Sequence, residues 1–103
     1  MKFRYAPEAI RDLQRMNDYI SNVLHNPAAA NRINKSILDA CATLKQQPFL
    51  GGSVREKIGH ETDLRFLVRE KYLIFYTVDE MSVARIINGR IGYAGILFGD
   101  EKD

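Results

Sequence analysis

The chain has 103 residues, 46% of them hydrophobic and 27% charged, which suits one domain with its own core and excludes wholesale disorder. Its single cysteine, Cys41, excludes an internal disulfide and a zinc site built from several cysteines. The net charge of +2 is too small to indicate a nucleic-acid partner by itself.

The N-terminal residues indicate the compartment. Met1 to Tyr5 carry charges and lead into Pro7 and Glu8 instead of an apolar run, so we expect no signal peptide. No stretch approaches the roughly 18 apolar residues of a membrane-spanning helix. We therefore expect a cytoplasmic protein that forms one domain over residues 1–103.

A short first strand, Lys2–Tyr5, is predicted to precede a long helix. Pro7 suits the first position of a helix, because its missing N–H group has no partner to lose there. The apolar spacing predicts that this helix runs from Glu8 to about Leu24. Its apolar stripe consists of Ile10, Leu13, Met16, Ile20, Val23 and Leu24.

A second long helix is predicted from about Pro27 to Gln47. Asn26 can cap it, and Pro48 is the expected stop. Because the link between the two helices is short, they must fold back as an antiparallel hairpin. The apolar stripe of the second helix consists of Ala30, Ile33, Ile37, Cys41 and Leu44, which makes Cys41 a core residue.

The C-terminal half predicts a sheet. Apolar residues alternate with arginines over residues 64–69, and two more strands are expected at Tyr72–Val78 and Val83–Asn88. Short turns join these strands, so they must be antiparallel. A strand around Val54–Ile58 and a helical turn at Tyr93–Phe98 are also expected. The result is an α+β fold in the order β-α-α-β-β-β, with the helical hairpin packed on an antiparallel sheet.

Arginines in the predicted strands are the candidate functional residues. Arg65 and Arg69 share one strand face with Leu67, and we expect this face to be the solvent-facing side of the sheet. Arg85 lies in an apolar strand, so it should share that face or pair with an acid. Arg90 ends the same strand. Such a surface can meet phosphates or the acidic side chains of a partner, and the apolar Leu67 favours a protein partner.

The order of elements, together with four segments, resembles the RelE/ParE toxin superfamily over about residues 3–98. The segments are AIRDLQRMNDYI (9–20), LKQQPFLG (44–51), DLRFLVREKYLIFYTV (63–78) and IINGRIGYAGILF (86–98). The resemblance implies the toxin of a type II toxin–antitoxin pair, which a cognate antitoxin silences in a hetero-oligomer. It implies no cofactor. The spacing of His60, Glu61 and Asp63 matches no metal site either.

Two activities occur in this superfamily, and they need different residues. RelE-like members cut mRNA on the ribosome, whereas ParE-like members poison DNA gyrase. Cleavage of RNA needs a base, cations at the phosphate and an acid. Arg65, Arg85 and Arg90 can supply the cations and Tyr93 the acid, but the sequence places no base beside them.

Two departures count against the ribonuclease. Leu73 stands where RelE-like ribonucleases often carry an arginine, and Asn88 stands where some relatives have a histidine. The long helical hairpin is also more ParE-like. We therefore expect a ParE-like inhibitor of DNA gyrase that acts by protein contact. The alternatives are a ribosome-dependent mRNA endoribonuclease and a toxin-like fold that serves only as a binding partner. The expected partner-binding residues are Arg65, Leu67, Arg69, Arg85, Arg90 and Tyr93.

Overall fold

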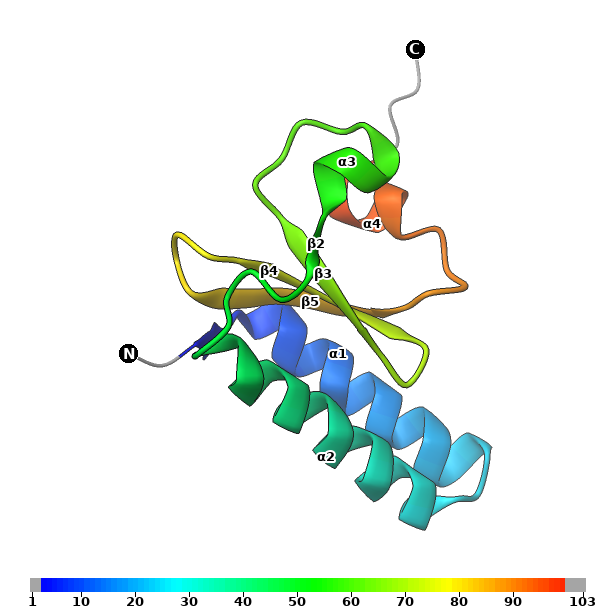
Figure 1. Ribbon diagram of the computed structural model, residues 1–103. Helices are drawn as coiled ribbons and strands as arrows, with labels where there is room; N and C mark the ends of the chain where they lie inside the picture. Colours follow the sequence, from blue (N-terminus) through cyan, green and yellow to red (C-terminus); the bar gives the residue numbers. More distant parts are fainter. Residues whose placement is uncertain (1–2, 100–103) are drawn as a thin grey trace.

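The computed structural model describes residues 3–99 and contains the predicted hairpin of helices. The first helix, α1 (Pro7–Asp18), continues as the π-helical turn η1 (Tyr19–Val23), and α2 (Pro27–Leu44) folds back beside them (Figure 1). The side chain of Asn26 accepts a hydrogen bond from the N–H of Ala29 at 3.1 Å, which confirms the predicted cap. The second helix ends earlier than the predicted Gln47.

The sheet has five strands in the order β1-β5-β4-β3-β2. They are β1 (Arg4–Tyr5), β2 (Gly52–Ser53), β3 (Arg65–Arg69), β4 (Tyr72–Thr77) and β5 (Ser82–Asn88). Strands β3, β4 and β5 pair antiparallel as predicted, and β2 pairs antiparallel with β3. Strand β1 pairs parallel with β5, so the sheet is mixed. This parallel pairing could not be predicted from turn lengths, because no short turn joins β1 to β5. Lys2 of the predicted first strand and residues 100–103 of the tail lie outside the described residues.

The strand predicted around Val54–Ile58 is wrong, because these residues form the short helix α3. Ser53 caps this helix by accepting a hydrogen bond from the N–H of Glu56 at 3.3 Å, and Gly59 ends it with a φ of 75°. The run Ser-Val-Arg-Glu is a helix-start signature. The helical turn predicted at Tyr93–Phe98 is confirmed as α4.

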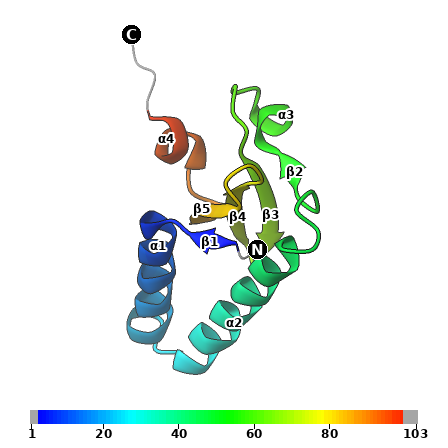
Figure 2. The same ribbon diagram turned by 90° about the vertical axis from the view of Figure 1, so that its left-hand side faces the viewer.

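Both faces of the sheet are covered. Figure 2 shows α1 and α2 on one side and α3 and α4 on the other. The core under the helical hairpin contains Ala9, Met16, Ile20, Ala30, Ile37, Ala40, Cys41, Leu44, Ile74, Tyr76, Val83 and Ile86. A smaller core on the opposite face contains Val54, Leu73, Phe75 and Ile87, with Tyr93, Leu97 and Phe98 packed against it.

The predicted stripe of the first helix is only partly buried. Ile10, Val23 and Leu24 are 45%, 60% and 55% exposed, whereas Ala9 and Asp12 are buried. Compared with the orientation that the predicted stripe implies, the helix is rotated about its axis towards the edge of β5. This rotation brings the Asp12 side chain into the interior. Within residues 3–99, no helix combines the length and the apolar character needed to cross a bilayer.

Candidate functional site

The strand face that carries Arg65, Leu67 and Arg69 is not the solvent-facing side of the sheet that we expected. Leu67 packs against the core under the helical hairpin, and side chains two residues apart in a strand share a face. The expectation failed because strand periodicity shows which residues share a face, but not which face the helices cover. The opposite face is apolar and lies under α3 and α4.

Arg65 holds the segment that follows α2. Its Nη2 donates to the carbonyl oxygens of Phe49, at 3.3 Å, and Gly51, and its guanidinium carbon lies 5.1 Å from the centre of the Phe49 ring. Its Nε is buried and has no acceptor within the described residues. The Arg65 guanidinium is therefore bound to carbonyl groups of the protein's own main chain.

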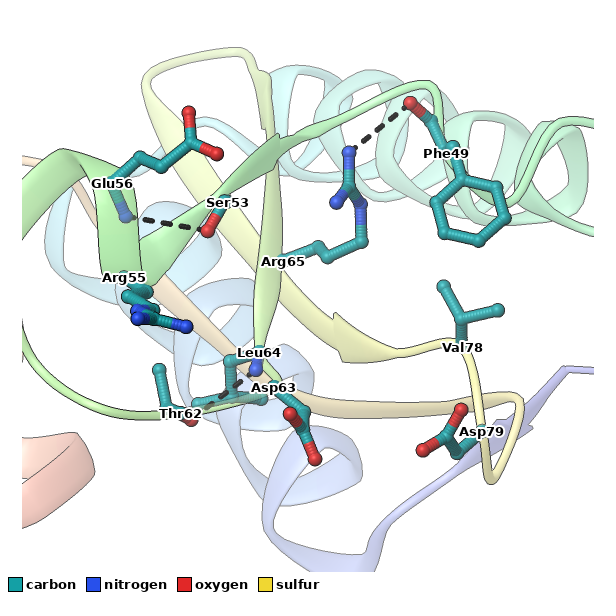
Figure 3. Close-up of a pocket in the computed structure, with 10 residues that line it drawn as sticks. All are labelled: Phe49, Ser53, Arg55, Glu56, Thr62, Asp63, Leu64, Arg65, Val78 and Asp79. Carbon is teal, nitrogen blue, oxygen red and sulfur yellow. Dashed lines mark hydrogen bonds between the residues drawn. The ribbon is translucent and has the colours of Figure 1, made fainter.

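A hollow of about 550 Å³ lies beside Arg65, between the segment after α2, α3 and the turn that joins β4 to β5. Figure 3 shows the Arg65 guanidinium directed towards Phe49, with the carboxylates of Asp63 and Asp79 at the other side of the hollow. Its full lining is Phe49, Ser53, Arg55, Glu56, Thr62, Asp63, Leu64, Arg65, Val78 and Asp79. Charges of both signs line this hollow, so it is not a cationic cradle for a phosphate.

Arg85 pairs with an acid, which is one of the two outcomes predicted for it. Its Nε and Nη2 donate to Oδ2 and Oδ1 of Asp12 at 2.8 and 2.9 Å. Asp12 Oδ2 also accepts the main-chain N–H of Ile86 at 2.9 Å. The hydrogen bonds to Asp12 are the main reason why the pKa of Arg85 is raised. Sequence reasoning missed Asp12, although its spacing from Ala9 and Met16 places all three on one helix face.

A second hollow, of about 470 Å³, lies between α1, the end of β5 and the segment that leads into α4. We call it the α1–β5 groove. It is lined by Asp12, Arg15, Met16, Tyr19, Tyr72, Arg85, Ile86, Ile87, Asn88, Arg90, Ile91 and Ile96.

The α1–β5 groove combines exposed apolar side chains with cations. Tyr19, Ile91 and Ile96 are 53%, 50% and 41% exposed. The Arg15 side chain is 67% exposed, with its Nη1 3.6 Å from Asp12, and Arg90 is also exposed. Exposed apolar surface bordered by positive charge fits an acidic protein segment with apolar residues of its own.

Tyr72 adds a neutral hydroxyl group to this groove. Burial raises the pKa of Tyr72, while its hydrogen bond to Asn88 has the opposite and smaller effect. The hydroxyl therefore stays protonated at neutral pH. It can donate or accept a hydrogen bond beside the arginines.

The residues considered for RNA cleavage are brought together only in part. Arg65 lines one hollow, whereas Arg85 and Arg90 line the other. Tyr93 packs on the apolar side of the sheet, with its ring centre 5.4 Å from that of Phe75. His60 stacks on Phe98 with 3.7 Å between the ring centres. Over residues 3–99, no three His, Cys, Asp or Glu side chains gather in a way that could hold a metal ion.

Comparison with known proteins identifies the family. Residues 3–93 match the family described as the ParE toxin of the type II toxin–antitoxin system parDE. The fold is similar to a chain in the structure of the chromosomal ParDE toxin–antitoxin system from P. aeruginosa, with a TM-score of 0.69 and 21% identity. That likeness covers 85% of this chain and 95% of the other. No curated protein matches the chain significantly. Because the family match spans most of its length, the chain belongs to the ParE toxin family of type II toxin–antitoxin systems.

Proposed function

We propose that the protein inhibits DNA gyrase by protein contact, and that its cognate antitoxin silences it by binding in the α1–β5 groove. Membership of the ParE family supports the toxin role and the choice of gyrase. The observation that carries the non-enzymatic mechanism is the separation of Arg65 from Arg85 and Arg90. RNA cleavage needs the cations and the proton donor around one phosphate, whereas Tyr93 also packs on Phe75, outside the groove that holds Arg85 and Arg90.

The occupied state of these arginines supports the same conclusion. Arg65 is bound to main-chain carbonyls, and Arg85 is held by two hydrogen bonds to Asp12. Moving either guanidinium to a phosphate would break contacts inside the protein. Moving Arg85 would also leave Asp12, which is 8% exposed, without its partner. Toxicity by contact with a protein target needs no such rearrangement.

The groove is the surface that best fits the antitoxin. It offers exposed tyrosine and isoleucine side chains for apolar contact, and Arg15 and Arg90 for charge complementarity. An acidic amphipathic segment would cover this exposed apolar area and neutralise its cations.

Induced expression in a bacterial host tests the target. Expression of the toxin alone should activate the DNA damage response before bulk translation falls, and co-expression of the antitoxin encoded beside it should abolish the response. Arrest of translation with cuts inside codons of translated mRNA, and no damage response, would instead identify the ribonuclease.

A further inference from the structure

We propose that the antitoxin enters the α1–β5 groove as an extended segment that runs parallel to β5 and pairs with it through one residue, opposite Ile87. This inference rests on the proposed function, in which the groove is the binding site of the antitoxin. It follows from the hydrogen-bonding groups that remain open along the edge of β5.

Strand β1 covers only the beginning of this edge, where Arg4 and Tyr5 lie opposite Ser82 and Val83. Beyond Val83 the edge faces α1 and the groove. The N–H of Gly89 donates to the carbonyl of Lys71 at 2.9 Å, on the side of β4. Because main-chain groups alternate in direction along a strand, those of Ile86 and Asn88 point away from β4 into the groove.

Two of these four groups are already occupied. The N–H of Ile86 donates to Asp12 at 2.9 Å, and the carbonyl of Asn88 accepts the N–H of Ile91 at 3.0 Å. The carbonyl of Ile86 and the N–H of Asn88 have no hydrogen-bond partner within residues 3–99. The open edge therefore consists of one acceptor and one donor, on either side of Ile87.

This pair of groups matches parallel pairing. In a parallel ladder, the N–H of a residue donates to the carbonyl of the residue that precedes its opposite residue. Its own carbonyl accepts from the N–H of the residue that follows the opposite residue. Arg4 pairs in this way at the other end of the same edge, since its N–H donates to the carbonyl of Met81 at 2.8 Å and it lies opposite Ser82. A residue opposite Ile87 would repeat the pattern.

An antiparallel segment fits less well because of Asp12. Antiparallel pairing at Ile86 needs both the N–H and the carbonyl of that residue. The N–H is bound to the Asp12 carboxylate, so the carbonyl of an antiparallel partner would lie against a negative charge. Asp12 therefore selects the direction of the bound segment.

The pairing also predicts which side chains the segment carries. Residues opposite each other in a ladder point to the same face, so the residue opposite Ile87 would point to the face that α4 covers, beside Ile91 and Ile96. Its two neighbours would point to the side of Arg15 and Tyr72. We expect an apolar residue between acidic residues.

Amide hydrogen exchange of the ¹⁵N-labelled toxin, free and in complex with the full-length cognate antitoxin, tests the pairing. Complex formation should slow the exchange of the Asn88 amide about tenfold or more, as expected for a new main-chain hydrogen bond in the groove. The Ile86 amide, which Asp12 already holds, should be slow in both states. Unchanged exchange at Asn88 would overturn the pairing.

Nitroxide labels on the antitoxin test the direction. A label on the N-terminal side of the bound segment should broaden the amide signals of Tyr5 and Val83, and one on the C-terminal side should broaden those of Asn88 to Ile91. The reverse pattern would overturn the parallel direction. Arg15→Glu separates this failure from failure of the proposed site, because it should weaken binding in either direction if the groove is occupied. Lys45→Glu, at the end of α2, is the matched control.

Discussion

Asp12 should contribute more to the stability of the protein than a carboxylate on the surface does. It accepts hydrogen bonds from Arg85 and from the N–H of Ile86, and it is 8% exposed. Asp12→Ala should lower the free energy of unfolding by about 3 kcal/mol, because it leaves the half-buried guanidinium without its partner. Urea denaturation measures this loss.

Asp39→Ala is the matched control for this substitution. Asp39 pairs with Lys35 at 3.3 Å on the surface of α2, and both side chains are largely exposed. Its removal should cost less than about 0.5 kcal/mol. Equal losses for the two substitutions would mean that Asp12 does not secure the edge of β5.

Buried Cys41 and the half-buried Tyr5 and Tyr72 predict how stability depends on pH. Burial raises the pKa of Tyr5, Cys41 and Tyr72 above their ordinary values of 10.0, 9.0 and 10.0. The folded state then holds these protons more tightly than the unfolded chain does. Their contribution is fully present below about pH 9 and is lost as the pH rises, first for the thiol and then for the phenols.

Thermal unfolding between about pH 8 and about pH 11 measures this dependence. The unfolding temperature should fall from about pH 9 upwards, and Tyr72→Phe should make the fall above about pH 10 shallower by removing one of the titrating groups. A constant unfolding temperature over this range would show that burial does not raise these pKa values.

The turn between β3 and β4 holds two residues in an unfavourable backbone conformation. Glu70 and Lys71 have φ values of 54° and 71°, in the left-handed region that favours glycine. Glu70 also lies 3.1 Å from Arg32 of α2, which links the turn to the helix. Because glycine adopts a positive φ without strain, Lys71→Gly should raise the free energy of unfolding by about 0.5 to 1 kcal/mol.

Lys35→Gly is the control for that prediction. Lys35 lies inside α2, where glycine should destabilise by about 1 kcal/mol. Urea midpoints of the two variants should move in opposite directions. A lower midpoint for Lys71→Gly would show that its side chain contributes more than the turn conformation costs.

The elements that could be predicted from the sequence are those set by local chemistry. Pro7 and Asn26-Pro27 fix the starts of the two helices. Alternating apolar residues mark β3, and a run that is apolar or aromatic at both parities marks β4. The parallel pairing of β1 with β5 could not be predicted from the sequence, because it joins distant parts of the chain. The helix α3 was missed because five residues are too few to show a period, although the Ser53-to-Glu56 signature was present.

The candidate site could be predicted only in part, for the same reason. Arg85 was expected to need an acid, but its partner Asp12 lies 73 residues away, so no local pattern names it. The α1–β5 groove arises where α1, β5 and the segment before α4 meet. Arg90 is among the partner-binding residues predicted from the sequence, whereas Arg15 and Tyr19 are not.

The sheet is covered on both faces, so a segment of another protein can add to it only at an edge, such as the part of β5 beyond β1. Arg15→Glu combined with Arg90→Glu should raise the dissociation constant of the antitoxin complex about tenfold or more, because like charges would then face an acidic segment. Titration calorimetry measures it. Lys45→Glu changes the same charge outside the groove and should leave the affinity unchanged. An equal loss of affinity in the Lys45→Glu variant would show that the effect comes from the change in net charge and not from the groove.

We propose that this chain of the ParE family inhibits gyrase by direct contact and that its antitoxin relieves the inhibition. Supercoiling of relaxed plasmid by purified gyrase, with increasing toxin and then with equimolar antitoxin, tests this most directly. We predict that the toxin stops supercoiling and that the antitoxin restores it. Full supercoiling at a large excess of folded toxin would contradict inhibition of gyrase by this protein.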